Sequence, residues 1–216
     1  MSNAVVFGAT GYAGSHILHE LVSRGFSVTA ISRSTPDKSS AESGVQWKSG
    51  SIHSAPLVNE VANGADVIVA AVPSRSDDGE SLAASVPHLL EAAERAGARL
   101  AVVGGAGTLL VATGEGTLVE QPTFPEAFKP NATAHAAALE ALRSNTSTAQ
   151  WFYLSPPAQF GAAFEGPRLG GYKTGKDTVL TNSDGKSTIS GADYALAFVD
   201  EISTPKHENE RFTVAS

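Results

Sequence analysis

The 216-residue sequence contains no cysteine. This absence excludes disulfide frameworks, thiolate zinc sites and thiol nucleophiles, and a cytoplasmic location is expected. His16 and His19 have no third ligand at a matching spacing, so no metal site is predicted. With 15 basic and 22 acidic residues, the net charge of −7 provides no basic face for nucleic acid. The apolar runs are too short for a membrane span of about 18 residues, and no signal peptide is predicted.

Short β-branched runs alternate with segments whose apolar residues recur at helical spacing. Strands are predicted at 4–7, 27–31, 45–47, 67–72, 99–103 and 150–154, with 211–215 as a candidate for a last one. Helical patterns lie at 13–22, 82–93, 130–142 and 195–202. The alternation predicts an α/β fold, a Rossmann-like doubly wound parallel sheet with helices on both faces.

The chain is expected to form a single NAD(P)-binding domain, residues 1–216. Residues 156–190 include an irregular, glycine-rich stretch with turn signals, and we interpret them as a loop or lid over a substrate. Pro87 lies within the second helical pattern, where it either kinks the helix or marks its start. Ser190 followed by Asp193 predicts a capped start for the last helix.

Three glycines follow the first predicted strand at the spacing G-x-x-G-x-x-G, in the sequence GATGYAG. The first glycine permits a tight turn, the second lets the backbone approach a pyrophosphate, and the third lets helix and strand pack closely. Unpaired N–H groups at the helix start then face the phosphates. The position between strand and helix favours a dinucleotide site over a turn without a ligand. The residues assigned to this loop are Gly8, Thr10, Gly11, Tyr12, Ala13 and Gly14.

No acidic residue follows the second predicted strand, where NAD-selective folds usually carry one for the ribose hydroxyls. Ser32 and Arg33 stand there instead, and Arg33 is a candidate partner for a 2′-phosphate, with a solvated surface arginine as the alternative. NADP(H) is therefore favoured over NAD(H) as the cofactor. The ends of the other strands supply the remaining cofactor-binding candidates: Ser51, Ile52, Ala71, Val72, Pro73, Gly104 and Pro156.

These motifs resemble the short-chain dehydrogenase/reductase superfamily, through GATGYAG at 8–14, ISR at 31–33 and the order of elements. The segments VVGGAGTL, FPEAFKP, YLSP and SGADYALAFVDEI are similar to an atypical group of NAD(P)H-binding proteins within it. That group includes Rrf2-linked NADH-flavin reductases and resembles biliverdin reductase B and NmrA-like proteins. The resemblance covers nearly the whole chain and implies a Rossmann fold that binds NAD(P)H.

The resemblance also implies where a catalytic triad would stand. A typical superfamily member has a serine at the end of the fifth strand and Tyr-x-x-x-Lys on the following helix. Here the strand is followed by Gly104–Gly107, and Ala132 and Ala136 occupy the tyrosine and lysine positions, so the triad is predicted to be absent. Tyr172 and Lys176 match the motif literally but lie in a glycine-rich segment, so we interpret them as unrelated to catalysis. The catalytic residues are left unassigned.

Ketone reduction without a positioned acid is disfavoured, because an alkoxide forms as hydride arrives. A flavin or quinone spreads the incoming charge and takes its proton from water, so the protein needs only to hold two rings face to face. The sequence therefore predicts an NAD(P)H-dependent oxidoreductase, NADPH favoured, acting on a flat conjugated acceptor. A nonenzymic NADP(H) sensor is the alternative, and a nucleotide-sugar epimerase is a weaker one.

Candidate substrate contacts follow the fifth and sixth strands. The small residues at 104–107, Gly107 among them, are expected to form a floor with room for a flat acceptor. His135 is a candidate proton donor or substrate contact, and the simpler interpretation is a partly exposed helix histidine. Phe160 either forms a wall over the acceptor or packs within its loop. The oligomeric state is not predicted.

Overall fold

The sheet of this protein has its strands in the order β3-β2-β1-β4-β5-β6-β8-β7, in a computed structural model that describes residues 2–34, 44–76, 78–111 and 115–216. The strands are β1 (Asn3–Phe7), β2 (Ser27–Ser32), β3 (Val45–Ser49), β4 (Val67–Ala70), β5 (Arg99–Val103), β6 (Trp151–Ser155), β7 (Lys173–Gly175) and β8 (Glu210–Ala215). All neighbours pair in parallel except β7, which runs antiparallel to β8. The strand order reverses at β1, as in doubly wound folds. The predicted fold class is confirmed, and the antiparallel edge strand is an addition that the sequence did not predict.

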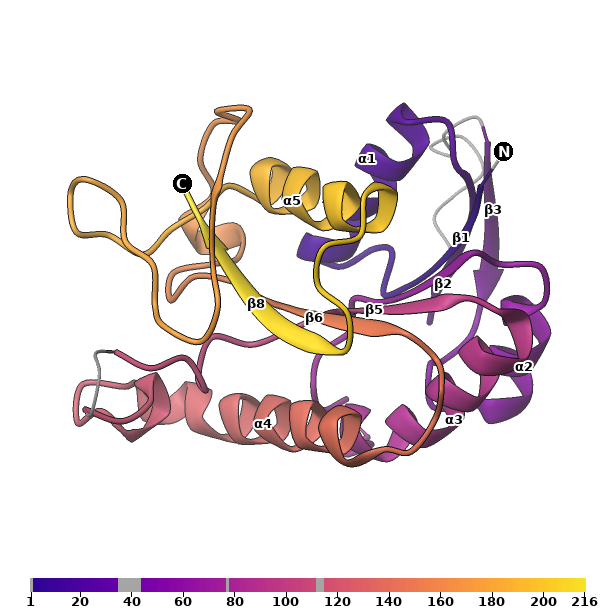
Figure 1. The fold of residues 1–216 in the computed structure, drawn as a ribbon, viewed down its shortest axis with the longest axis horizontal. Helices are drawn as coiled ribbons and strands as arrows, with labels where there is room; N and C mark the ends of the chain where they lie inside the picture. Colours follow the sequence, from indigo (N-terminus) through magenta and orange to yellow (C-terminus); the bar gives the residue numbers. More distant parts are fainter. Residues whose placement is uncertain (1, 35–43, 77, 112–114) are drawn as a thin grey trace.

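Helices cover both faces of the sheet (Figure 1). They are α1 (Tyr12–Ser23), α2 (Ala55–Ala62), α3 (Leu82–Ala96), α4 (Lys129–Ser144) and α5 (Gly191–Ser203). Helices α1 and α5 lie side by side on one face, and α2, α3 and α4 cover the other. This arrangement places the turn between β1 and α1 at the carboxyl edge of the sheet, where doubly wound folds bind their ligands.

The central strands are apolar on both sides because both of their faces are covered. In β1, Val5 and Phe7 pack in the cluster that includes α3 and α4. Ala4 and Val6 point the other way and pack with α1 and α5. Continuous apolar strands of this kind are typical of buried parallel sheets. The two faces therefore form two separate apolar clusters on either side of the sheet.

Helix α3 shows how local signals set the boundaries. The Ser81 hydroxyl accepts a hydrogen bond from Ala83 N at 3.2 Å, which caps the start of the helix. The helix ends at Gly97, which adopts the left-handed conformation with φ 66°. Pro87 lies inside α3, so it does not mark the start of this helix.

Helix α2 was not predicted from the sequence. It begins after Ser54 with a proline in its first turn, and only Val58 and Ala62 along it are buried. A short helix with so narrow a buried face gives a weak periodic signal.

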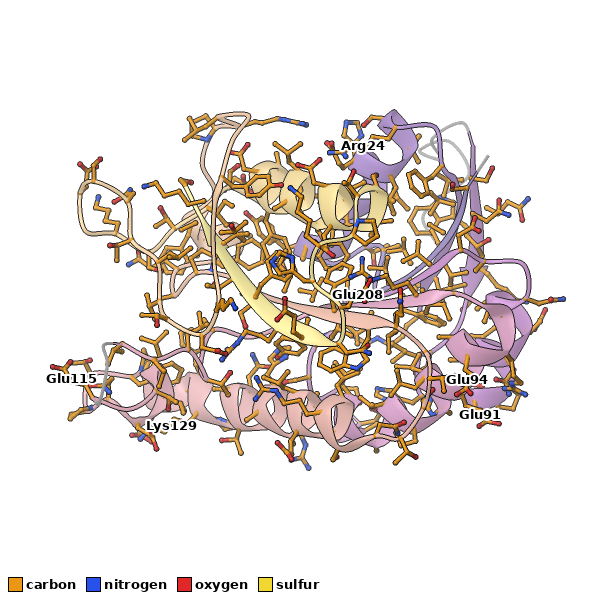
Figure 2. All side chains as sticks on the ribbon, in the orientation of Figure 1. Arg24, Glu91, Glu94, Glu115, Lys129 and Glu208 are labelled. Carbon is orange, nitrogen blue, oxygen red and sulfur yellow. The ribbon has the colours of Figure 1, made fainter. Side chains whose placement is uncertain are left out.

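Charged side chains lie mainly around the outside of the fold, as Arg24, Glu94 and Lys129 do in Figure 2. Arg24 at the end of α1 contacts Asp200 on α5 at 2.8 Å and Glu20 on its own helix at 2.7 Å. The pair with Asp200 joins the two helices that cover one face. Within the described ranges, no helix is long and apolar enough to cross a membrane.

Candidate functional site

A crevice of about 210 Å³ lies at the carboxyl ends of β1, β2 and β4. Its lining includes these predicted cofactor residues: Gly8, Thr10, Gly11, Ser32, Arg33, Ser51, Ile52, Ala71, Val72 and Pro73. Phe7, His53 and Ser76 also line it, and the sequence reasoning did not identify them. Phe7 ends β1 and His53 follows Ile52 directly, so their nearness to motif residues was the available signal. The structure thus gathers residues from four separate segments around one crevice.

Gly8 makes the tight turn that the motif predicts. Its φ is +78°, and a Cβ at this position would lie 2.1 Å from the carbonyl oxygen of Ala71 at the end of β4. A Cβ at Gly14 would lie 2.1 Å from the carbonyl oxygen of Gly8, so the third glycine allows α1 to pack against the turn. The first and third glycines therefore have the backbone roles expected from their spacing.

Gly11 is the N-cap of α1 and lines the crevice. No side chain caps the helix there, and its first turn carries no acidic residue. The first N–H groups of a helix have no partner within it, and together with the helix dipole they favour an anion. Tyr12, Ala13 and Gly14 form that first turn and are not lining residues of the crevice. This end of α1 is suited to a phosphate group.

Arg33 lies exposed at the end of β2, where it lines the crevice. The Ser49 hydroxyl donates to the Arg33 carbonyl at 3.0 Å, and the Ser32 hydroxyl donates to the Ser34 carbonyl. Among the described residues that line the crevice, none is acidic. Arg33 therefore brings a positively charged side chain to this side of the crevice.

Two histidine contacts hold the segment after β3 against α3. His53 Nδ1 lies 2.7 Å from the Ser85 hydroxyl, and His88 Nε2 lies 2.9 Å from the Ile52 carbonyl oxygen. These contacts fix Ile52 and His53 after the end of β3. Because β2 lies between β3 and β1, the two residues border the crevice on the far side from the glycine loop. A rigid wall of this kind suits a flat ring such as a nucleobase.

The glycines after β5 pack closely against other parts of the protein. A Cβ at Gly104 would lie 2.1 Å from the Tyr153 ring, and a Cβ at Gly105 would lie 2.8 Å from the His135 ring. A Cβ at Gly107 would lie 2.6 Å from the Cβ of Ala132. The space on the Cβ side of these glycines is therefore filled by protein, and a floor for a flat acceptor on their other side stays a prediction.

His135 is buried, with 7% of its surface exposed, so the expected partly exposed histidine is corrected. Its Nδ1 lies 3.2 Å from the hydroxyl of Tyr153, which in turn accepts a hydrogen bond from Gly105 N at 2.9 Å. Burial lowers the pKa of His135 to about 4. Burial also raises the pKa of Tyr153. Two neutral side chains therefore meet beside the Gly104–Gly105 backbone, and the partner of His135 is a tyrosine on β6, the strand that follows α4.

The first part of the predicted lid packs against α1 and α5. The centroid of the Phe160 ring lies 5.2 Å from that of Tyr12 and 4.5 Å from that of Tyr194. Phe160 therefore packs against the rings of α1 and α5. Tyr172 donates a hydrogen bond to Asp200 on α5 at 2.7 Å. Tyr172 and Lys176 flank strand β7 rather than lying on a helix. Pro156 is buried directly after β6.

Asp193 anchors the same segment. Its buried carboxylate accepts hydrogen bonds from the backbone N–H groups of Leu169 and Gly170, both at 2.8 Å. The Ser190 hydroxyl, which caps α5 as predicted, accepts from Asp193 N at 3.1 Å. Arg168 adds an ion pair of 3.0 Å to Glu20 on α1. This part of the segment is thus tied to two helices at once.

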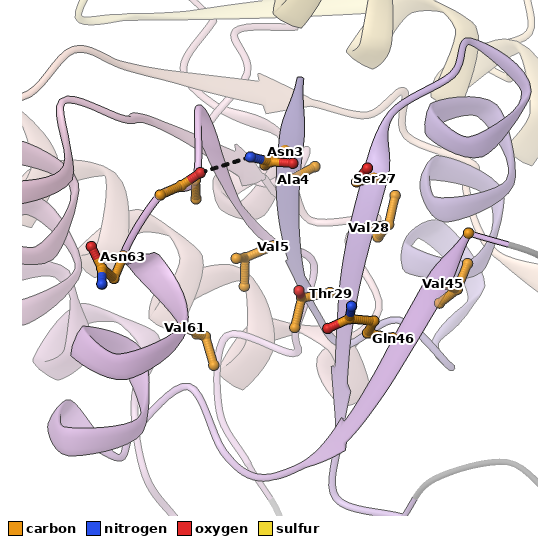
Figure 3. A pocket seen from close by; sticks show the side chains of 13 residues that line it. Asn3, Ala4, Val5, Ser27, Val28, Thr29, Val45, Gln46, Val61 and Asn63 are labelled. Carbon is orange, nitrogen blue, oxygen red and sulfur yellow. Dashed lines mark hydrogen bonds between the residues drawn. The ribbon is translucent and has the colours of Figure 1, made fainter. Parts of the chain in front are cut away.

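A second hollow, of about 460 Å³, lies at the amino ends of β1, β2 and β3 (Figure 3). Asn3 at its edge donates a side-chain hydrogen bond to the Gly64 carbonyl at 3.0 Å. The hollow lies at the opposite edge of the sheet from the glycine turn. Among the described residues that line this hollow, none is charged. Nor do the described residues group three histidine or acidic side chains as metal ligands.

Comparison with known proteins places the site in a family. Residues 8–205 match the model of a family described as NAD(P)H-binding. The chain is 37% identical over 215 residues to the uncharacterized protein YwnB of Bacillus subtilis, covering 98% of this chain and 97% of that one.

Two solved structures are similar over the whole fold. A "putative epimerase" from Bacteroides thetaiotaomicron is 33% identical with a TM-score of 0.86, over 99% of this chain and 96% of that one. A "putative NADH-flavin reductase" from Streptococcus pneumoniae is 33% identical with a TM-score of 0.83, over 100% of both chains. The glycine turn, the uncapped helix and the family match agree, and the chain belongs to the NAD(P)H-binding family.

Proposed function

We propose that this protein is an NAD(P)H-dependent reductase that prefers NADPH and transfers hydride to a flat conjugated acceptor such as a flavin or a quinone. The observation that carries the proposal is the crevice at the carboxyl edge, where the glycine turn, the uncapped start of α1 and Arg33 converge. The family match supports the nicotinamide cofactor.

The residues present fit such a dinucleotide in its usual orientation across the carboxyl edge. The N–H groups at the start of α1 suit the pyrophosphate, and Ile52 with His53 forms a wall for the adenine. Ser32 and Arg33 suit a 2′-phosphate, and the absence of acidic lining residues in the described crevice supports NADPH over NADH. The nicotinamide end is assigned to Gly104 and Pro156. When bound, the cofactor supplies the hydride.

The proposed acceptor class follows from the residues after β5 and on α4. By the resemblance to the superfamily, Ala132 and Ala136 on α4 stand at the positions of its catalytic tyrosine and lysine, so we assign no general acid at these two positions. An acceptor that spreads charge over its own rings does not need one. The Streptococcus pneumoniae relative, named as a flavin reductase, supports this class. Its name specifies NADH, so the preference for NADPH rests on Arg33.

Turnover with a panel of acceptors tests the proposal. The oxidation of NADPH is followed by its loss of fluorescence, with FMN, FAD or a quinone as acceptor and with simple aldehydes and ketones for contrast. We expect oxidation with at least one conjugated acceptor and little with the simple carbonyl compounds. NADPH binding without oxidation by any acceptor would point to a sensor instead. Turnover of simple carbonyl compounds alone would contradict the proposed acceptor class.

A further inference from the structure

The buried pair of His135 and Tyr153 is not part of the lining of the crevice, and polar groups are costly to bury unless they are hydrogen-bonded. His135 projects from α4 toward the end of β5, where its ring packs against Gly105. One turn earlier on α4, Asn131 accepts a hydrogen bond of 2.6 Å from the hydroxyl of Ser74. Ser74 follows Pro73, which lines the crevice. His135 therefore lies where α4 meets the ends of β4 and β5, on the side toward which the nicotinamide half is expected to extend.

The hydrogen bonds around Tyr153 decide where the imidazole carries its proton. The Tyr153 oxygen accepts from Gly105 N at 2.9 Å, so its own proton is left to donate. Two acceptors lie within reach, His135 Nδ1 at 3.2 Å and the His135 carbonyl oxygen at 3.3 Å. That carbonyl lies inside α4, where it already accepts a helical hydrogen bond. Nδ1 is thus the better acceptor, and a neutral imidazole that accepts at Nδ1 carries its proton on Nε2.

The Nε2 atom of His135 makes no hydrogen bond within the described chain. Among the described residues, the fully buried side-chain polar atoms without a partner are Tyr12 OH, Trp47 Nε1 and Arg99 Nε, and His135 Nε2 is not one of them. His135 Nε2 is therefore not fully sealed, and its hydrogen-bonding capacity is not used by the described residues.

We infer that His135 is a catalytic hydrogen-bond donor, whose Nε2–H binds a carbonyl oxygen of the acceptor, and that Tyr153 is the positioning residue that fixes this tautomer. The inference rests on the proposed function and narrows the acceptor to molecules with a carbonyl conjugated to the position that receives hydride. As hydride adds, negative charge develops on that oxygen, and an oriented N–H stabilises it. The imidazole keeps its proton, and the proton that completes the reduction comes from water.

The neutral state of the imidazole is consistent with this role. Burial lowers the pKa of His135 to about 4, so the ring is uncharged near neutral pH. A neutral imidazole can act as a hydrogen-bond donor to a carbonyl group without a protonation step, as the neutral histidine of triosephosphate isomerase illustrates.

Three substitutions at His135 separate donation from packing. Glutamine carries its amide N–H near the place of Nε2, asparagine carries it near Nδ1, and phenylalanine has none. We expect kcat for a quinone or flavin to fall roughly 10- to 100-fold in His135→Phe and His135→Asn, the range of one hydrogen bond to a developing charge. His135→Gln is expected to recover most of the rate, and the dissociation constant for NADPH is expected to stay within about twofold of the wild-type value in all three.

The tautomer itself is measured by ¹⁵N NMR on the wild-type protein labelled in histidine, with the His135 signal assigned by its loss in His135→Gln. We expect the Nε2–H tautomer at pH 7 and a mixture of tautomers in Tyr153→Phe. Tyr172→Phe is the control, because it removes another tyrosine hydroxyl, one that donates to Asp200 on α5 at 2.7 Å. This control is expected to leave both the tautomer and kcat unchanged.

Equal rates in the wild type and His135→Phe, or equal losses in His135→Phe and His135→Gln, would overturn the inference while the reductase itself stands. An Nδ1–H tautomer in the wild type would overturn it independently of activity. If the wild type oxidises no NADPH with any acceptor, the proposed function fails as well, a result distinct from both of these.

Discussion

The two halves of the carboxyl edge are built in different ways. Around β1, β2 and β4, the glycine turn and residues from three other segments border a crevice. Around β5 and β6, Gly104 and Gly105 are just as close to their neighbours, but those neighbours are the rings of Tyr153 and His135. In the first half, glycine lets backbone pack against backbone, Gly8 against the Ala71 carbonyl and Gly14 against the Gly8 carbonyl, whereas glycine in the second half makes room for buried rings. The same residue type thus shapes a backbone turn in one half and accommodates side chains in the other.

Among the substitutions considered, Gly8→Ala should have the largest effect on the stability of the first half and on NADPH binding. The substitution forces a left-handed φ on alanine and drives its Cβ into the Ala71 carbonyl. We expect a loss of about 3 kcal/mol or more in the free energy of unfolding, together with loss of NADPH binding. Gly25→Ala is the control, since Gly25 also has a positive φ, +81°, but nothing within 4 Å of its Cβ position. That control should cost only about 1 kcal/mol by denaturant unfolding, and equal losses would contradict the close approach.

The buried imidazole of the second half should make stability depend on pH. Because the pKa of His135 is about 4 when folded and 6.5 ordinarily, the unfolded state binds more protons between these values. Stability should therefore fall as pH drops from about 6.5 to 4, by about 3 kcal/mol. In His135→Phe this part of the pH dependence should disappear. Parallel unfolding curves for the two proteins across this pH range would show that the imidazole is not desolvated.

Arg33→Ala tests the specificity of the first half. Removing a charged hydrogen bond to a 2′-phosphate should weaken NADPH binding by about 1 to 3 kcal/mol and leave NADH binding nearly unchanged. Calorimetric titration of both nucleotides measures the difference. Equal losses for the two cofactors would mean that Arg33 does not contact the 2′-phosphate.

The packing role of Gly105 predicts a smaller, coupled effect. Gly105→Ala should lower the free energy of unfolding, because the new Cβ meets the His135 ring. The loss should be smaller when His135 is also replaced by alanine. A double-mutant cycle by denaturant unfolding should give a coupling energy of about 1 kcal/mol. Additive losses would show that the two positions do not share space.

The sequence predicted most of the fold because its strands are continuous apolar runs, as Val67–Ala70 shows. It also identified most of the residues that line the crevice, and the backbone roles of Gly8 and Gly14 could be predicted because they depend on contacts close to the turn itself. Strand β7 was not predicted, because it has only three residues and gains its stability from pairing with β8 at the edge.

The second half of the edge was harder to predict for a physical reason. His135 lies on α4 and Tyr153 on β6, the next element along the chain, and their contact depends on how α4 packs against the sheet. No local pattern encodes such a meeting, and the glycines at 104–107 read equally well as a floor or as packing. The anchoring of residues 168–172 on α1 and α5 has the same tertiary origin.

The most direct test of the central claim is a calorimetric titration of the wild-type protein with NADPH and with NADH. The geometry of the glycine turn predicts that both bind, and Arg33 predicts that NADPH binds at least about tenfold more tightly. Binding of neither nucleotide would contradict the assignment of the crevice as a dinucleotide site. Tighter binding of NADH would contradict the assignment of Arg33 to a 2′-phosphate.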